Sequence, residues 1–383
     1  MRKSHSKVLP LALLGLSVSL LCWLPAHAQG TSTALTGMVN VKEFGAKGNG
    51  VTDDTAALKA AIAEQQLLMP GGGELYFPYG TCDTLKLQSV CDVRGVGNPQ
   101  IVMTDPKKDI MSASAAWRMT FTGLTFVDGR RQLALVNPNL DTGAIYIENC
   151  KFMRSEEQAI ETSLRSTNVF IEKCHFLQCE QALTTTTDMV TMRDSWITSK
   201  MGMTDKAQIE ARGDMMLLEN LCLVPLVSGV RQRWIDNYSA WFLTCRSVRF
   251  GGEFGGFTPI YNFAKAIYVA SGPSILVEDC TIGANGSYNA NCAVYCEEVP
   301  NKIEVRSCGL VGCKPIILSK NVDLRTCFTG IPRNTLSFTA TGNLGSYAEA
   351  IPPCCETPSV RQGNSQACQT RSPRRPWRKT LRR

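Results

Sequence analysis

One eight-residue pattern recurs along this chain, and it limits the possible folds more than any other feature. The pattern runs apolar, any, apolar, any, turn residue, apolar or Cys, any, apolar. Its copies begin at Met119, Ile145, Val169, Val190 and Met216, and in looser form at Ala240, Ile275, Ile303 and Val322. Repeats of this kind indicate a solenoid, because a single unit cannot bury its apolar face and must stack on its neighbours.

Each copy predicts two short strands with alternating burial, joined by a tight bend. In five copies the fifth position holds a residue that tolerates the left-handed backbone of such a bend. These residues are Gly123, Asn149, Asp194, Asn220 and Asp279. With a third strand between copies, a repeat of roughly 24 residues describes one coil of a parallel β-helix. The gaps are too short, and too rich in Thr, Ser and Gly, for the crossover helices of an alternating strand and helix fold.

The pattern also places many of the 17 cysteines. The sixth, inward position is occupied by Cys150, Cys174, Cys245, Cys280, Cys308 and Cys327. Reduced buried Cys behaves as a small apolar residue, so we expect a stack of free thiols in a narrow corner of the coil. Disulfides are the alternative in an exported protein, and would involve Cys292, Cys296, Cys354, Cys355 and Cys368.

Both ends of the chain differ from the repeat. Residues 1–28 have a basic start, an apolar run and Ala26-His27-Ala28, which is typical of a cleavable signal peptide. Export to a secreted or periplasmic location is therefore expected. Residues 29–350 are assigned to the β-helix domain, and residues 351–383 to a basic tail expected to be disordered. No later segment is long and apolar enough to span a membrane.

Charge alone suggests a binder of polyanions, because the chain has 40 Lys and Arg against 33 Asp and Glu, a net charge of +7. Three of the basic residues belong to the leader and eight to residues 361–383. Both regions lack Asp and Glu, so 29 basic residues face 33 acidic ones in residues 29–360, a balance of −4. A specific nucleic-acid partner is therefore not expected.

A short strand, a Gly-rich loop and a helix are predicted between Val39 and Gln65, where the sequence reads VNVKEFGAKGNGVTDDTAALKAAIAEQ. Thr52 is expected to cap the helix, with Asp53 and Asp54 in its first turn. Leu58, Ala61 and Ile62 form one apolar face. A phosphate-binding loop is excluded, because no Gly-Lys-Ser/Thr follows the glycines.

This segment, together with GGGELYFP from Gly71, closely resembles the N-terminal signature of the pectate-lyase-like superfamily, which includes rhamnogalacturonases, polygalacturonases and epimerase-type proteins. The resemblance implies that the helix plugs the first turn of a right-handed parallel β-helix. The expected fold class is thus all-β, a right-handed parallel β-helix with an N-terminal capping α-helix. The resemblance also implies extracellular polysaccharide chemistry, often on uronic-acid polymers, but assigns no reaction.

The chain departs from the polygalacturonase pattern after the first helix. The Asn-Thr-Asp, paired Asp, Gly-His-Gly and Arg-Ile-Lys motifs are all missing. His175 is the only histidine after the leader, at the outward seventh position of its coil, so schemes with a histidine pair or a Ser-His-Asp triad are excluded. Paired-Cys zinc spacing is not convincing, and no clear carboxylate cluster indicates a calcium-dependent lyase.

The strands that follow each copy supply the candidate site. If Ile160, Leu183, Ile209, Ile267 and Val294 point inward, an outward column contains Glu161, Thr184, Glu210, Tyr268 and Tyr295. Coils lie roughly 4.8 Å apart, which places the two glutamates about 10 Å apart. That is near the upper end of the ~6.5–9.5 Å carboxylate separation in inverting glycoside hydrolases.

Glu161 and Glu210 are therefore the candidate catalytic pair, one protonating the leaving oxygen and the other activating water. Solvated surface carboxylates are the simpler interpretation. Tyr268 and Tyr295 are candidates for stacking on sugar rings, and Arg212 for binding a uronate carboxylate. Trp196 and Trp241 are expected to point outward, either as a sugar platform or packed under loops.

A second outward column, which is expected to be a self-compensating charge ladder, contains Glu148, Glu172, Arg193, Glu219, Leu243, Glu278, Arg306 and Arg325. The hypothesis for function is an exported carbohydrate-active protein that cleaves an acidic polysaccharide, by hydrolysis before β-elimination. The alternatives are a non-catalytic glycan-binding or adhesion protein and a uronan epimerase. The expected partner is a polysaccharide. No cofactor or metal is expected, except calcium if the protein is a lyase. The sequence does not indicate the oligomeric state.

Overall fold

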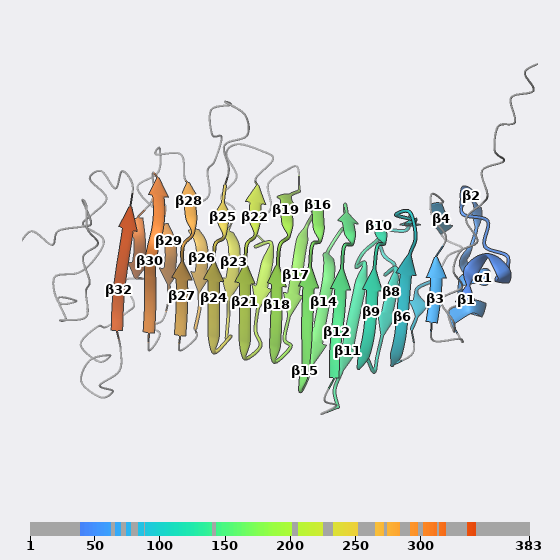
Figure 1. Ribbon diagram of the computed structural model, residues 1–383, viewed down its shortest axis with the longest axis horizontal. Coiled ribbons are helices and arrows are strands. Elements are labelled where there is room, and N and C mark those ends of the chain that lie inside the picture. The colour runs from blue at the N-terminus through green and yellow to red at the C-terminus, as the bar shows by residue number, and fades with distance from the viewer. Residues whose placement is uncertain are drawn as a thin grey trace, which may run out of the picture. The chain divides into compact units, whose positions relative to one another are not determined.

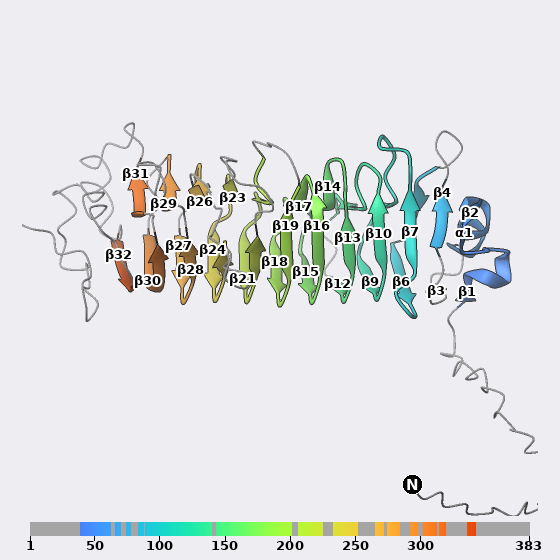
Figure 2. The same ribbon diagram turned by 90° about the horizontal axis from the view of Figure 1, so that it is seen from above.

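The structure of the protein is a computed structural model. It describes residues 39–62, 66–69, 74–77, 83–87, 89–139, 143–200, 206–224, 233–251, 265–271, 274–283, 292–297, 302–311, 314–318 and 335–341. Within these residues the chain forms a parallel β-solenoid with one 22-stranded sheet, called sheet A, and one 10-stranded sheet, called sheet B. Figures 1 and 2 show the strands stacked coil after coil along one axis. The predicted parallel coil is confirmed.

Sheet A consists of two ladders of parallel strands. The first ladder contains β1 (Val39–Asn40), β3 (Gln66–Met69), β6 (Val90–Gly95), β9 (Arg118–Thr122), β12 (Gly143–Glu148), β15 (Thr167–Glu172), β18 (Met189–Arg193), β21 (Met215–Glu219), β24 (Phe242–Arg246), β27 (Ser274–Glu278), β30 (Lys302–Val311) and β32 (Thr335–Thr341). The second ladder contains β2 (Asn49–Asp53), β4 (Glu74–Phe77), β7 (Gln100–Met103), β10 (Thr125–Asp128), β13 (Lys151–Met153), β16 (His175–Cys179), β19 (Trp196–Ser199), β22 (Cys222–Val224), β25 (Arg249–Phe250) and β28 (Thr281–Gly283), and it ends on β30.

Sheet B is a single ladder. Its strands in spatial order are β5 (Leu85–Lys86), β8 (Met111–Ala113), β11 (Leu133–Asn137), β14 (Gln158–Leu164), β17 (Gln181–Thr185), β20 (Ile209–Ala211), β23 (Arg233–Asn237), β26 (Lys265–Val269), β29 (Cys292–Cys296) and β31 (Lys314–Leu318). The third strand of each predicted coil therefore forms a sheet of its own.

A 3-10 helix η1 (Val41–Phe44) and an α-helix α1 (Thr55–Ile62) lie in the N-terminal part of the described chain. Leu58, Ala61 and Ile62 are buried, as their apolar spacing predicts. The predicted start is wrong, because α1 begins after Asp54 and Thr52 belongs to β2. Asp54 instead accepts backbone hydrogen bonds from Lys47 at 2.6 Å and Gly48 at 3.1 Å, and so fixes the Gly-rich loop.

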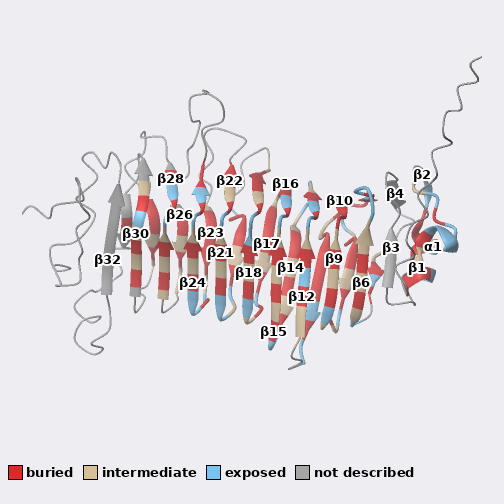
Figure 3. Ribbon diagram, in the orientation of Figure 1, coloured by how far each residue is buried: buried red, intermediate tan, exposed pale blue. Residues whose placement is uncertain are grey.

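The interior is filled by side chains that repeat in register from coil to coil. Alternating residues along the strands are buried, as the bands in Figure 3 show. At the eighth position of the pattern, Phe126, Phe152 and Phe176 form a stack with ring centroids 5.1 and 4.9 Å apart. Each stacked pair of this kind stabilises the folded protein by about 0.5–1.5 kcal/mol beyond the burial of its rings. Because the rings stack only when the coils are in register, the repeated apolar position favours that register.

At the corner between the two ladders of sheet A, the residue at the fifth position of the pattern has the predicted left-handed backbone conformation. Asn149, Asp194, Asn220 and Asp279 have φ between 51° and 53°, and Gly123 has φ 68°. Lys173, Ser247 and Ser307 adopt the same conformation. The stacked coils therefore impose this backbone even on residues that do not favour it.

The cysteines at this corner are free and buried, as predicted for Cys150, Cys174, Cys280 and Cys308. Each thiol donates to the carbonyl two residues earlier, for example from Cys150 to Glu148 at 3.3 Å. Burial raises the pKa of Cys150 to about 12, so this thiol stays protonated. Cys292 and Cys296 are buried and form no disulfide with a described residue, which contradicts the suggested disulfides at these two positions. Cys327, Cys354, Cys355 and Cys368 lie outside the described residues.

The predicted register is wrong for the copy of the pattern at Ala240. Leu243, not Ala240, is paired with Met216, so Val248 takes the sixth position and Cys245 is a buried residue of β24. Leu243 is buried, and Arg246 takes its place in the outward charge ladder. The copy at Val322 lies outside the described residues, and β32 is the strand that pairs with β30.

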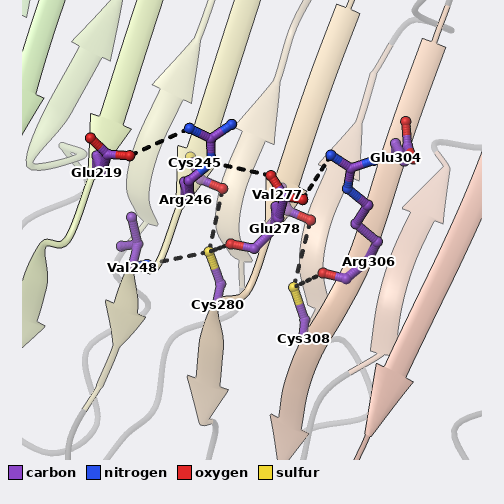
Figure 4. Close-up of polar contacts among 10 residues, drawn as sticks. All are labelled: Glu219, Cys245, Arg246, Val248, Val277, Glu278, Cys280, Glu304, Arg306 and Cys308. Carbon is purple, nitrogen blue, oxygen red and sulfur yellow. Dashed lines mark hydrogen bonds and ion pairs between the residues drawn. The ribbon is translucent and has the colours of Figure 1, made fainter.

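The charge ladder itself is present on the outer side of the first ladder of sheet A. Glu278 pairs with Arg246 at 3.2 Å and with Arg306 at 2.7 Å, and Arg246 also pairs with Glu219 at 3.4 Å. Figure 4 shows these pairs beside the thiols of the same corner. Opposite charges on neighbouring coils thus compensate each other, as predicted for this column.

Candidate functional site

An outward column on sheet B brings the main candidate residues together. Glu161 on β14 is in register with Thr184, Thr184 with Glu210, Glu210 with Asp236, Asp236 with Tyr268, and Tyr268 with Tyr295. The inward residues of the same strands, Ile160, Leu183, Ile209, Ile267 and Val294, are fully buried, as predicted. We call the six residues in register from Glu161 to Tyr295 the sheet-B column; Asp236 among them is only 2% exposed.

Every carboxylate of the sheet-B column is paired with an arginine. Arg131 contacts Glu161 through Nη1 and also holds Asp109, at 2.6 Å. Arg212 Nε donates to Glu210 Oε1 at 2.7 Å, and Arg233 Nη2 lies 3.2 Å from Asp236 Oδ2. The positive and negative groups alternate closely, so the column presents many hydrogen-bonding atoms with little net charge.

The order of the carboxylates along the column sets their spacing. Glu161 and Glu210 are two ladder steps apart, roughly 10 Å, with Thr184 between them. Glu210 and Asp236 are direct neighbours, about 4.8 Å apart at the backbone. Glu210 is therefore closer to Asp236 than to its predicted partner.

The second half of the column is aromatic. The rings of Tyr268 and Tyr295 are stacked with centroids 5.9 Å apart, and Tyr238 meets Tyr268 edge to face at 6.3 Å. The guanidinium carbons of Arg212 and Arg233 lie 4.3 Å from the Tyr238 ring centre and 4.9 Å from that of Tyr268, respectively. Cation–π contacts and ring stacking hold this group in one arrangement.

The hydroxyls of Tyr238 and Tyr268 are hydrogen-bond donors at neutral pH. Burial and the carboxylate of Asp236 raise the pKa of Tyr238, and burial and Glu297 raise the pKa of Tyr268. The Tyr238 hydroxyl donates to Asp236 Oδ2 at 3.4 Å. Aromatic faces beside hydroxyl and carboxylate groups are the chemistry that sugars require, because a sugar ring has apolar C–H faces and polar edges.

Arg131, Arg233, Asp236 and Tyr238 were not predicted as site residues. β23 was missed because its sequence, RWIDN from Arg233, does not alternate apolar and polar residues. Strand β23 could have been predicted from the regular spacing of the repeat. A third strand is required between the coils at Met216 and Leu243, and Ile235 is the residue in register with Ile209 and Ile267.

The structure does not bring the two predicted tryptophans to the sheet-B column. Trp196 lies on β19 in sheet A, in register with His175 and Cys222. Trp241 is 60% exposed and precedes β24, also in sheet A. His175 is exposed, and its pKa is lowered by partial burial and by Lys151 on the neighbouring coil. These residues therefore form no common site with Tyr268 and Tyr295.

Two further observations concern the described residues only. Among them, no group of three or more His, Cys, Asp or Glu side chains is placed to hold a metal ion. In the same part of the chain, no helix has the length and apolar character needed to cross a membrane.

The fold and the N-terminal segment define the class of protein. Residues 38–82 match the family model described as rhamnogalacturonase A/epimerase, pectate lyase-like. This match covers the segment in which the sequence resembles that superfamily, and the rest of the described chain forms the parallel solenoid. The chain is therefore similar to the pectate-lyase-like superfamily over this N-terminal segment.

Short stretches of the chain are similar to curated proteins of Azotobacter vinelandii. Mannuronan C5-epimerase AlgE1 is 35% identical over 97 residues, which are 22% of this chain and 6% of that protein. Mannuronan C5-epimerase AlgE5 is 56% identical over 41 residues, which are 11% of this chain and 4% of that protein. The matched regions are thus a small part of these relatives.

Solved structures of several parallel solenoids resemble this one at low sequence identity. The A-module of Azotobacter vinelandii mannuronan C-5 epimerase AlgE4 has a TM-score of 0.40 and 14% identity, covering 74% of this chain and 94% of that chain. A mutant tailspike protein of the E. coli bacteriophage HK620, in complex with a hexasaccharide, has a TM-score of 0.45 and 12% identity. The match covers 82% of this chain and 67% of that chain.

Proposed function

We propose that the protein is an exported carbohydrate-active β-helix protein that binds a polysaccharide along the sheet-B column. The observation that carries this proposal is the stacked pair of Tyr268 and Tyr295 in the same ladder as the carboxylate of Glu210. Rigid aromatic faces beside fixed hydrogen-bonding groups are suited to sugar rings. The names of the relatives, which are polysaccharide epimerases, agree with this ligand class.

The geometry favours binding of an extended chain rather than a single sugar. The column repeats its groups at roughly 4.8 Å along five ladder steps, so successive sugars of a polymer would meet successive coils. Arginine and carboxylate groups along the column can pair with hydroxyls and, at Arg212 and Arg233, with sugar carboxylates.

Cleavage of the bound chain is the second candidate function, and the carboxylates of the column favour it. Glu161 and Glu210 lie near the upper limit of the ~6.5–9.5 Å separation of inverting hydrolases. Glu210 and the buried Asp236 are neighbours in the ladder, with backbones about 4.8 Å apart, whereas the two carboxyl groups of retaining hydrolases are ~5–5.5 Å apart. We propose Glu210 as the residue common to either pair. Lyase and epimerase activity are further outcomes of the same assay.

Binding and cleavage are tested together with a panel of acidic and neutral polysaccharides. Affinity electrophoresis measures binding, and reducing ends, unsaturated products and altered uronate stereochemistry are scored separately. Tyr268→Ala and Tyr295→Ala are each expected to weaken binding about tenfold, because each removes one stacking face. Trp241→Ala is the control and should leave binding unchanged, because Trp241 is an exposed aromatic residue next to β24 of sheet A.

Different results contradict different parts of the proposal. Unchanged binding in both tyrosine variants, with circular dichroism showing intact folding, would exclude the column as the glycan site. Reducing ends without unsaturated products indicate hydrolysis. If Glu210→Gln and Glu161→Gln each abolish the reducing ends, Glu161 and Glu210 are the catalytic pair. If Glu210→Gln and Asp236→Asn each abolish them, the pair is Glu210 and Asp236. Binding without any product identifies a glycan-binding protein, and cleavage undiminished in Glu210→Gln removes the proposed catalytic role.

We further propose that residues 1–28 are a cleaved signal peptide and that α1 caps the N-terminal end of a right-handed coil. The basic start and Ala-His-Ala site support the first point. The buried face of α1 supports the second. N-terminal sequencing of the exported protein is expected to begin at Gln29, and retention of Met1 would refute the cleavage.

A further inference from the structure

The first ladder of sheet A carries an apolar column on its outer side. Met189, Met215 and Phe242 are in register on β18, β21 and β24, and they are 41%, 49% and 49% exposed. Leu217 and Leu276 lie in the next outward column and are half-buried. Contiguous apolar surface on a soluble protein commonly marks an interaction site. This surface is therefore suited to contact with another protein.

A charged column runs beside the apolar one on the same strands. Its six residues are in register from β15 to β30 and alternate in sign: Glu172, Arg193, Glu219, Arg246, Glu278 and Arg306. Three carboxylates and three guanidinium groups leave the column without net charge. The arginine side chains are 42–47% exposed, so they can still reach a partner although each already pairs with a glutamate of its own chain. Figure 4 shows the part of this column from Glu219 to Arg306.

The alternation of sign makes the charged column complementary to a second copy of itself. A two-fold axis that runs parallel to the strands, between β21 and β24, would set this face against the same face of another copy with the order of the strands reversed. Because the column has an even number of alternating charges, each carboxylate then faces a guanidinium of the other copy. The facing residues are Glu219 and Arg246, Arg193 and Glu278, and Glu172 and Arg306.

The same axis brings the apolar residues together. Met215 of each copy would face Phe242 of the other, and thioether sulfur packs favourably on aromatic rings. A two-fold axis along the direction of stacking would instead place the charged column of one copy over the apolar column of the other. Burial of charges against apolar side chains is costly, so the axis parallel to the strands is the favoured one.

We propose that the outer face of the first ladder, from β15 to β30, is the interface of a reversible homodimer in which the two solenoids are antiparallel. Six strands at roughly 4.8 Å and five residues at roughly 3.3 Å give a face of about 29 by 17 Å, or about 1,000 Å² over both copies. That is at the lower end of specific interfaces, so the dimer should dissociate on dilution. The interface is on sheet A and does not rest on the proposed function.

Sedimentation velocity of the full chain over a range of concentrations tests the dimer. Wild-type protein is expected to change from monomer to dimer as its concentration rises. Phe242→Asp should weaken dimerisation about a hundredfold or more, because an unpaired carboxylate would be buried against Met215 of the other copy. The matched control is Val136→Asp, since Val136 is an exposed apolar residue of sheet B, and this variant should dimerise like the wild type.

Two charge reversals test the orientation of the dimer. Glu219→Arg makes three neighbouring positions of the charged column positive, and Arg246→Glu makes three of them negative. Each variant alone should be monomeric, because like charges face each other. A mixture of the two should form a heterodimer, because the positive run of one copy faces the negative run of the other. Asp128→Arg, on the second ladder, is the control and should dimerise like the wild type.

The mixture separates contacts between copies from contacts within one chain. The ion pairs within each chain stay broken on mixing, so only contacts between copies can restore association. Wild-type protein that stays monomeric at every concentration would overturn the proposal. A dimer that survives Phe242→Asp would place the interface elsewhere. Folded single variants that remain monomeric after mixing would refute the two-fold axis between β21 and β24.

Discussion

Arg131 connects the edge of the sheet-B column to a carboxylate inside the wall of the coil. Its guanidinium contacts Glu161 on one side and Asp109 on the other, and Arg130 also bonds to Asp109, at 2.9 Å. The Asp109 side chain is only 7% exposed. Burial opposes its charge, but hydrogen bonds from Arg131 and Arg130 outweigh burial and hold the pKa of Asp109 below its usual range.

Replacement of Asp109 is therefore expected to destabilise the protein. Asp109→Asn removes a nearly buried carboxylate from Arg130 and Arg131, of which only Arg131 keeps another carboxylate among the described residues, that of Glu161, and should lower the free energy of unfolding by about 2 kcal/mol. The control is Asp128→Asn, which also loses two bonds to one guanidinium, that of Arg154, but at an exposed position. That change should cost less than about 1 kcal/mol. Equal losses in urea unfolding would contradict this account.

The same ion pair predicts a pH dependence. Because the folded pKa of Asp109 is lowered, its stabilising contribution is fully present above the unfolded pKa of roughly 4 and is lost as the pH falls through the folded value. Urea unfolding of wild type and Asp109→Asn should therefore converge at low pH. A constant difference between them down to about pH 2 would argue against the ion pair as the cause.

At the scale of strands, the outer charge ladder of sheet A links coils that are distant in sequence. Glu278 on β27 lies between Arg246 on β24 and Arg306 on β30, and it accepts from both. Each pair is partly exposed, so a single pair contributes little, but a shared carboxylate joins three neighbouring coils. The thiols of the same corner contact each other at Cys280 and Cys308, and this contact together with burial raises the pKa of Cys280.

Removal of the shared charge should affect stability more than removal of an isolated surface charge. Glu278→Gln is expected to lower the free energy of unfolding by about 1 kcal/mol, and less at high salt. The comparison is Asp83→Asn, because Asp83 also lies between two cations, Lys59 and Lys108, but its side chain is 56% exposed. That variant should unfold at nearly the wild-type urea concentration. If Asp83→Asn lowered the free energy of unfolding more than Glu278→Gln does, the charge ladder would not contribute to stability.

The sequence predicted the strands where local preference and stacking agree. Asn149, Asp194, Asn220 and Asp279 favour the left-handed bend, and their copies were placed in the correct register. The register failed at Ala240, because Cys245 was placed at the sixth position by analogy with the other cysteines. The frame that begins at Leu243 fits the pattern better, since its eighth position is the apolar Phe250, whereas the frame from Ala240 has Ser247 there.

The candidate site, like the strands, could be predicted where its residues lie on strands with a regular alternation. Glu161, Glu210, Tyr268 and Tyr295 were placed in one column from the alternation of their strands, and the structure has them in one ladder. Asp236 was missed together with β23. The arginine partners could not be foreseen, because Arg131 lies just before its strand and reaches Glu161 on the next coil.

At the scale of the molecule, the solenoid turns a local motif into a long binding surface. From β14 to β29 the sheet-B column spans five ladder steps, about 24 Å. The polar half with Glu161 and Glu210 and the aromatic half with Tyr268 and Tyr295 are consecutive along this line. A ligand that uses both halves must therefore extend parallel to the axis of stacking.

This geometry predicts how affinity depends on the length of the ligand. Within one series of oligosaccharides, each added sugar should strengthen binding until the chain spans about 24 Å, after which further sugars should add little. Tyr295→Ala shortens the aromatic half at its far end, so the plateau should begin at a shorter oligosaccharide. Trp241→Ala should leave the wild-type dependence intact. If a single sugar already binds as tightly as a long chain, the ligand does not follow the column, and the solenoid axis is not the direction of recognition.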